Sequence, residues 1–252
     1  ASDAATKAMS LDDSIPEPYI ALSYVKLVDK GGIAESKDLI ERAIETAPYN
    51  STAHVRYGWI LLNQGNLDRT VEEMRLAQEY DPVSPISNAA LCNALDFQGK
   101  ADEAIKYCEK SAELAPGLNG AQIALAEAYF AGGRHNDAVN LGEKIVASGG
   151  DEDQKLSALA SVGYFHAKLG HRQAAEKIVA EIRPHASQNP IFLNDMVVIN
   201  YALGKRDEGY AYFQQLYEHR AMPPFLLKYD PAWADVRADE RVIKLISKSR
   251  NG

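Results

Sequence analysis

The sequence predicts an all-α solenoid, in which short helices stack in pairs and further helices cover the C-terminal end. The first observation is a set of prolines that recur at an interval of 34 residues: Pro48, Pro82 and Pro116. The second is a set of glycines with the same interval: Gly31, Gly65, Gly99 and Gly133, and later Gly170 and Gly204. The third is the helical spacing of the apolar residues between these marks. A fixed period of this length is the signature of stacked repeats.

Each repeat is expected to form a helix, a short turn, a second helix and a stop at proline. Residues 51–63, for example, place Val55, Trp59 and Leu62 on one helical face. Glycine permits the tight turn between the two helices, and proline ends the second helix. The pattern predicts twelve helices, over residues 17–30, 33–46, 51–63, 67–80, 85–98, 101–114, 119–132, 135–148, 153–169, 172–183, 190–203 and 206–219.

Two glycines, Gly58 and Gly163, fall inside predicted helices, where glycine costs about 1 kcal/mol relative to alanine. Both occupy the same position of their repeat. We expect them to permit close packing of paired helices, opposite the small residues Thr70 and Ala175.

Over residues 17–220 the pattern resembles the tetratricopeptide repeat, whose usual period is 34 residues. The second unit matches the family's small, glycine and proline positions at Gly58, Gly65, Ala77 and Pro82, and the third matches at Cys92, Gly99, Ala104, Ser111 and Pro116. The family's tryptophan is missing, and an insertion with Gly149 and Gly150 predicts a bend or a change of register. The resemblance implies six helix pairs in a right-handed superhelix.

The two ends of the chain are expected to differ from the repeats. Residues 1–16 fit the tail of a preceding repeat, so we expect the chain to belong to a longer protein. Residues 221–252 are predicted to form a C-terminal cap, because Asp230–Pro231 and Asp239 are good helix starts. The apolar residues that would cover the last open face are Trp233, Val236, Val242, Leu245 and Ile246.

Several segments are also similar to the C-terminal repeat region of bacterial signalling regulators. They are SLDDSIPEPYIALSYVKL, TAHVRYGWIL and YDPAWADVRADERVIKLI. In those regulators a winged-helix DNA-binding domain, a Ser/Thr kinase or a nucleotide cyclase precedes the repeats. The resemblance implies a sensory or interaction module, and it leaves the effector and the side of the membrane open.

Composition and motifs argue against most other functions. The net charge of −8 disfavours direct contact with nucleic acid, and no apolar run is long enough for a membrane span. GxSxG, HExxH and Walker motifs are all missing, so we expect no enzymatic activity and no cofactor. His166 and His171 are separated by a predicted turn, and the acidic run Asp151–Asp153 suits the start of a helix, so no metal site is expected.

The only two cysteines, Cys92 and Cys108, fall on facing helices of one repeat. They could lie close enough for a disulfide. Because both are ordinary core positions, we expect buried free thiols.

The resemblance places a binding groove on the concave face, along the first helix of each unit. The residues predicted to line it are Val55, Trp59, Asn93, Asp96, Glu127, Phe130, Tyr164, Asn194 and Tyr201, with Arg56 beside the row. The groove positions lack the lysines with which the chaperone-binding subfamily holds a terminal carboxylate. Aromatic rings alternating with carboxylates and amides suit a peptide, a protein or a small ligand, including one with a basic group. The alternative is an architectural spacer or dimerisation module with an empty groove.

Overall fold

The structure is a computed structural model that describes residues 2–28, 32–148, 152–186, 189, 191–219 and 222–249. Within these ranges the chain is helical and contains no β-strand. None of the described helices has the length and hydropathy needed to cross a bilayer.

Six helix pairs stack in chain order, as predicted. They are α2 (Pro16–Val28) with α3 (Ile33–Thr46), α4 (Ser51–Asn63) with α5 (Leu67–Tyr80), α6 (Pro85–Phe97) with α7 (Ala101–Leu114), α8 (Asn119–Ala131) with α9 (His135–Ala147), α10 (Glu152–Lys168) with α11 (Arg172–Ala186), and α12 (Ile191–Ala202) with α13 (Arg206–Glu218). The largest departure from the predicted bounds is α11, which continues to Ala186. Its Pro184 lies in the last turn, where the missing N–H removes one hydrogen bond and the helix ends two residues later.

The periodic glycines form the turns within the pairs, and all five of those described have φ near +75°. They are Gly65 (78°), Gly99 (73°), Gly133 (79°), Gly170 (79°) and Gly204 (75°). This left-handed conformation is costly for residues with a Cβ atom, which explains the recurrence of glycine. Gly31, Gly149 and Gly150, and with them the predicted bend, lie outside the described residues.

The two helical glycines allow close packing, but only one faces the residue we expected. Thr70 Oγ1 donates to the Gly58 backbone oxygen at 3.2 Å, so this predicted contact is confirmed. A Cβ on Gly163 would lie 2.7 Å from Cγ2 of Ile178, so the partner there is Ile178, one turn beyond the predicted Ala175.

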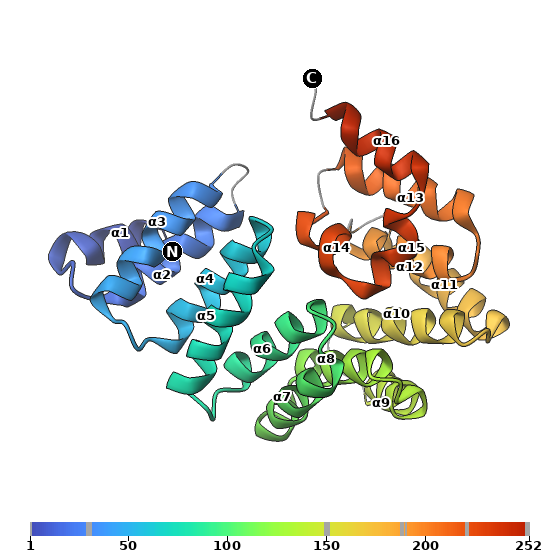
Figure 1. The fold of residues 1–252 in the computed structure, drawn as a ribbon, viewed down its shortest axis with the longest axis horizontal. Helices are drawn as coiled ribbons and strands as arrows, with labels where there is room; N and C mark the ends of the chain where they lie inside the picture. Colours follow the sequence, from blue (N-terminus) through green and yellow to red (C-terminus); the bar gives the residue numbers. More distant parts are fainter. Residues whose placement is uncertain are drawn as a thin grey trace.

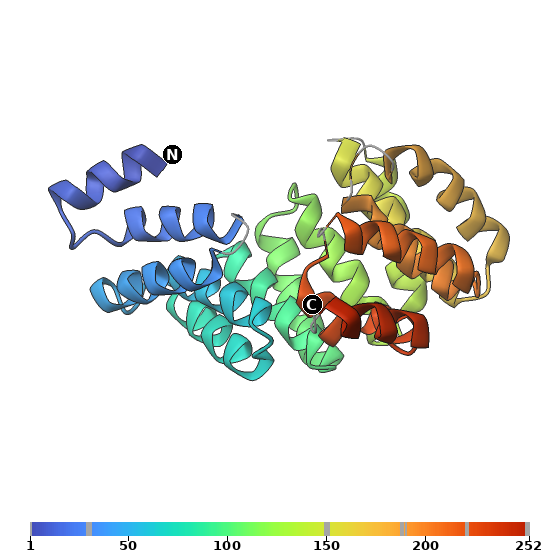
Figure 2. The same cartoon turned by 90° about the horizontal axis from the view of Figure 1, so that it is seen from above.

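The units form a right-handed superhelix with its apolar core distributed along the array. In Figure 1 the array bends into an arc, with the first and last units on either side of its concave face. Viewed from above, α1 (Ser2–Leu11) lies at the N-terminal end beside α2, and its Ala5 is buried (Figure 2). Buried residues form several clusters along the chain rather than one centre, as expected of a repeat protein.

The C-terminal segment packs on the last unit through α15 (Ala234–Arg237) and α16 (Glu240–Ser249). Trp233 is only 2% exposed, as expected, and it packs on Phe213 with their ring centroids 6.4 Å apart. Val236 and Val242 are fully buried in the same cluster.

Residues 224–233 do more than cover the last unit. They form α14 (Pro224–Tyr229) and the short helix η1 (Pro231–Trp233), and we call them the strap. Lys228 Nζ donates to the backbone oxygen of Gly65 at 3.0 Å, and Tyr229 donates its hydroxyl to the same oxygen. The strap therefore lies across the concave face from the sixth unit to the second (Figure 1).

The expectation of free thiols was wrong, because Cys92 and Cys108 form a disulfide between α6 and α7. Small residues bring the two helices of the unit close together, and the Cα atoms lie 5.4 Å apart. This separation falls within the range of about 4.4–6.8 Å that a disulfide spans.

Candidate functional site

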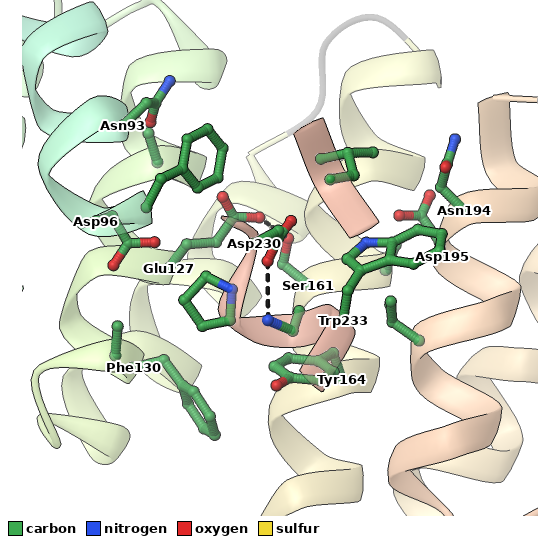
Figure 3. A pocket seen from close by; sticks show the side chains of 18 of the residues that line it. Asn93, Asp96, Glu127, Phe130, Ser161, Tyr164, Asn194, Asp195, Asp230 and Trp233 are labelled. Carbon is green, nitrogen blue, oxygen red and sulfur yellow. Dashed lines mark hydrogen bonds between the residues drawn. The ribbon is translucent and has the colours of Figure 1, made fainter. Parts of the chain in front are cut away.

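A cavity of about 510 Å³ lies on the concave face, between the strap and the first helices of the third to sixth units. Its walls come from α6, α8, α10 and α12, and the strap closes one side (Figure 3). Small-molecule sites in proteins are typically about 300–1,000 Å³, so the cavity has the size of a ligand site.

Four carboxylates line this cavity, and each comes from a different element. Asp96 lies on α6, Glu127 on α8, Asp195 on α12 and Asp230 on the strap. Figure 3 shows Asp96 and Asp195 on opposite sides, with Glu127 and Asp230 between them. Among the described lining residues there is no lysine, arginine or histidine. The cavity is therefore strongly acidic.

Two of the carboxylates have hydrogen-bond donors within the protein. Ser161 Oγ donates to Glu127 at 2.8 Å, and the Ala232 backbone N–H donates to Asp230 at 2.8 Å. The other two are less well satisfied. Asp96 Oδ1 is buried without a hydrogen-bond partner, and no hydrogen bond or ion pair within the described chain reaches Asp195.

All four carboxylates hold their protons more tightly than usual. Burial, with repulsion from Asp230, raises the pKa of Asp96 to about 6, and burial raises the pKa of Asp230 itself to about 6. The Glu127 side chain is exposed, but it faces the cavity, which protein surrounds on most sides. This burial raises the pKa of Glu127 to about 7, although the hydrogen bond from Ser161 acts to lower it. Burial and the charges of Glu127 and Asp230 raise the pKa of Asp195 to about 8. Of the four carboxylates only Asp230 has a nearby cation, Arg237, whose charge lowers the Asp230 pKa by less than burial raises it.

Aromatic rings form much of the remaining wall. Phe97, Phe130, Tyr164 and Trp233 all line the cavity, and the rings of Phe130 and Tyr164 meet edge to face with centroids 5.8 Å apart. Aromatic faces attract organic cations, so the rings and the carboxylates favour the same kind of ligand.

Six of the ten residues predicted to line the groove border this cavity: Asn93, Asp96, Glu127, Phe130, Tyr164 and Asn194. The other four do not border the cavity, and for two of them the prediction is wrong because their side chains are buried in the core. Val55 is 5% exposed, within the core, and Tyr201 is 4% exposed and donates its hydroxyl to Asp239 at 3.0 Å.

Arg56 and Trp59 lie outside the cavity for a different reason. The Arg56 guanidinium lies over the Tyr24 ring, 4.5 Å from its centroid. Trp59 packs against Phe225 of the strap, with centroids 6.4 Å apart. Among the described residues, the first two units therefore contribute no side chain to the cavity.

Sequence reasoning missed Ser161, Asp195, Asp230 and Trp233 as site residues. Asp195 had a usable signal, since it is the single charged residue in the largely apolar helix IFLNDMVVINYA. For Asp230 the sequence predicts only the start of a helix. It does cap η1, but its carboxylate also borders the cavity.

The described residues offer no metal site with three or more histidine, cysteine or carboxylate ligands. The pair that the sequence singled out, His166 and His171, lies with the two Nδ1 atoms 3.1 Å apart. Glu152 and Asp153 lie in the first turn of α10, and Asp151 is outside the described residues.

Two parts of the chain match family profiles described as tetratricopeptide repeat: residues 26–85 and residues 98–162. None of the curated protein sequences compared with the chain matches it.

Solved tetratricopeptide structures share the fold at low sequence identity. PilW, a type IV pilus biogenesis factor, is 18% identical with a TM-score of 0.63, over 84% of this chain and 97% of that one. TTC0263, a thermophilic tetratricopeptide protein of Thermus thermophilus, is 17% identical with a TM-score of 0.60, over 75% and 98%. YrrB, a tetratricopeptide protein with an unusual peptide-binding site, is 17% identical with a TM-score of 0.54, over 75% and 100%. The repeat matches and the architecture together show that this chain has a tetratricopeptide repeat fold.

Proposed function

We propose that the chain is a non-enzymatic binding module whose acidic cavity binds a positively charged group of a peptide, protein or small ligand. Tetratricopeptide repeat proteins generally serve as protein-interaction scaffolds. The observation that carries the proposal is the set of four cavity carboxylates with no cationic side chain among the described residues that line the cavity.

The physical argument rests on the cost of enclosing unpaired charge. A carboxylate removed from water loses solvation, and without a counter-charge it binds a proton instead. A ligand ammonium or guanidinium would supply both the missing charge and hydrogen-bond donors for Asp96 and Asp195. The rings of Phe130, Tyr164 and Trp233 would attract the same cation.

The biological role that we propose is the sensory or interaction part of a larger bacterial signalling or transcriptional regulator. Support comes from the resemblance of the C-terminal segment and the repeats to such regulators. The peptide-binding site of the similarly folded YrrB supports a peptide as one class of ligand. In this role an upstream effector would respond to occupancy of the cavity.

The test uses Trp233 as the reporter, because it is one of two tryptophans and borders the cavity. In a Trp59→Phe background, the emission of Trp233 is followed during titration with N-acetyl-lysine methylamide, the arginine equivalent and the neutral norleucine equivalent. We expect the two basic probes to change the emission and the neutral probe to bind at least about tenfold more weakly, the loss of one charged hydrogen bond.

Two variants show whether binding occurs at the cavity. Glu127→Gln should weaken the basic probes, whereas Glu113→Gln, at an exposed position of α7, should not. Equal binding of the neutral probe would refute recognition of charge. If no basic probe changes the emission, the groove would be better explained as that of an architectural spacer.

A further inference from the structure

The strap restricts what can lie along the concave face. Phe225 packs between Trp59 and Phe97, with ring centroids 6.4 and 5.7 Å away. Lys228 and Tyr229 hydrogen-bond to the Gly65 turn of the second unit. An extended peptide laid along the whole face would have to displace these contacts. The open space is the compact cavity beside the strap (Figure 3).

The carboxylates of this cavity are spread over its walls rather than gathered at one point. Asp96 and Asp195 face the cavity from α6 and α12, on opposite sides (Figure 3). The buried Asp96 Oδ1 and the Asp195 carboxylate are also the groups without protein partners in the described chain. One ammonium group cannot reach two opposite walls at once, so a ligand with separated charges satisfies the site better.

The net charge of the cavity also favours a ligand with more than one positive charge. With pKa values of about 6 for Asp96 and Asp230, about 7 for Glu127 and about 8 for Asp195, about two negative charges remain near pH 7. Arg237 lies beside Asp230 and partly offsets the rise of its pKa, but the Arg237 guanidinium donates to backbone oxygens, Nη1 to Leu227 and Nη2 to Asp230. Neighbouring Lys168 on α10 pairs with Asp235 instead.

Part of the cavity lining is apolar. Ala160, Val198, Leu226 and the aromatic rings form this apolar part, alongside the polar side chains of Asn93, Ser161 and Asn194. A chain of methylene groups packs favourably on such surfaces.

From this arrangement we infer that the cavity binds a small linear aliphatic polyamine, with ammonium groups at Asp96 and Asp195 and its methylene chain along Tyr164, Val198 and Trp233. Glu127 and Asp230 are then available to pair with any further ammonium group of the ligand. This inference rests on the proposed function, because it names the ligand class of the same site.

The experiment compares amines that differ in the number of charges. The full chain is titrated calorimetrically with 1,4-diaminobutane, the triamine spermidine, the monoamine 1-aminobutane and N-acetyl-lysine methylamide. We expect both polyamines to bind and the two single-charge probes to bind at least about tenfold more weakly, because they lose one charge-assisted hydrogen bond.

Matched variants assign the binding to the cavity. Asp96→Asn and Asp195→Asn should each weaken 1,4-diaminobutane at least about tenfold, whereas Asp38→Asn, an exposed aspartate of α3, should leave binding unchanged. The two cavity variants should fold, since neither removes a group with protein partners that depend on its charge. Their melting curves check this directly.

The outcomes separate the two proposals. If the single-charge probes bind as tightly as the polyamines, with the same sensitivity to Asp195→Asn, the polyamine inference fails and the proposed function stands. If no cationic probe binds, both fail. Tight polyamine binding that Asp96→Asn and Asp195→Asn leave unchanged would place the ligand elsewhere and overturn the inference.

Discussion

Lys228 donates a hydrogen bond to the backbone oxygen of Gly65 at 3.0 Å, although 163 positions separate the two residues. Gly65 is the glycine of the turn in the second unit, and Lys228 lies on the strap that follows the sixth. The contact joins distant parts of a solenoid whose units otherwise contact mainly their neighbours. It also fixes one side of the acidic cavity.

Removing the strap's attachment to this turn should loosen it without unfolding the repeats. The double variant Lys228→Ala with Tyr229→Phe removes two hydrogen bonds, each contributing about 0.5–1.5 kcal/mol. We expect faster amide hydrogen exchange in α14 (Pro224–Tyr229), measured by mass spectrometry. Lys244→Ala, on the exposed face of α16, is the matched control. Unchanged exchange in α14 would show that these contacts do not hold the strap.

Trp233 should be a major source of stability for the C-terminal segment. Its side chain is 2% exposed and packs on Phe213, so Trp233→Ala should cost about 3–5 kcal/mol in denaturant unfolding. The exposed Ile243→Ala (54% exposed) should change stability by less than about 0.5 kcal/mol. Equal effects of the two substitutions would be inconsistent with a C-terminal cap that stabilises the last unit.

The Cys92–Cys108 disulfide should make stability depend on redox conditions. The cysteines are 16 positions apart, and closing a loop of about this length stabilises a protein by roughly 3 kcal/mol. Thiol titration of the denatured, unreduced protein should detect no free thiol. Reduction should then lower the melting temperature by several degrees, about 2–4 °C per kcal/mol. Two free thiols after purification without reductant would argue against the disulfide.

The ligand-free protein should become less stable as the pH rises from about 4 to about 8. The cavity carboxylates have pKa values raised above those of the unfolded chain, so over this range the folded state binds more protons than the unfolded state. The free energy of unfolding therefore falls as pH increases. Asp195→Asn and Glu127→Gln should flatten this dependence and should be more stable than the parent at pH 8.5, as measured by thermal unfolding.

Groups outside the cavity also contribute to the pH dependence of the free energy of unfolding. Burial lowers the pKa of His54, but its hydrogen bonds with Glu73 and the Pro48 backbone oxygen outweigh burial and the pKa is raised. The contribution of His54 to the free energy of unfolding is therefore also lost as pH rises. Asp239 behaves in the opposite sense, because Arg241 lowers its pKa and its contribution is lost only in acid. Asp38→Asn is the control. A profile for Asp195→Asn and Glu127→Gln identical to that of the control would contradict the assignment.

The repeated part of the fold could be predicted because glycine and proline carry local conformational information. Gly65 and its equivalents need a positive φ, and Pro48 and its equivalents end helices, so the period is visible without tertiary structure. The strap could not be predicted in the same way. Contacts such as that of Lys228 with Gly65 depend on the curvature of the whole array, which no local pattern specifies.

The same reasoning explains why only some of the residues that line the cavity could be predicted. Asp96 and Glu127 were found because they occupy regular positions of the repeat. Asp195 is one position away from the predicted Asn194, and a shift of one residue turns a side chain by about 100° around a helix. Asp230 enters the cavity only because the strap folds back, so its role was not visible in the repeat pattern.

The most direct test of cation binding by the acidic cavity is the number of protons exchanged when a cation binds. The heat of binding of 1,4-diaminobutane is measured calorimetrically at pH 7 in buffers of different ionisation enthalpy, for the parent and for Asp195→Asn. Pairing with an ammonium group lowers the raised pKa values of Glu127 and Asp195, so protons should be released to the buffer, and fewer should be released by the variant. No heat of binding, or heats that are the same in every buffer, would contradict the account.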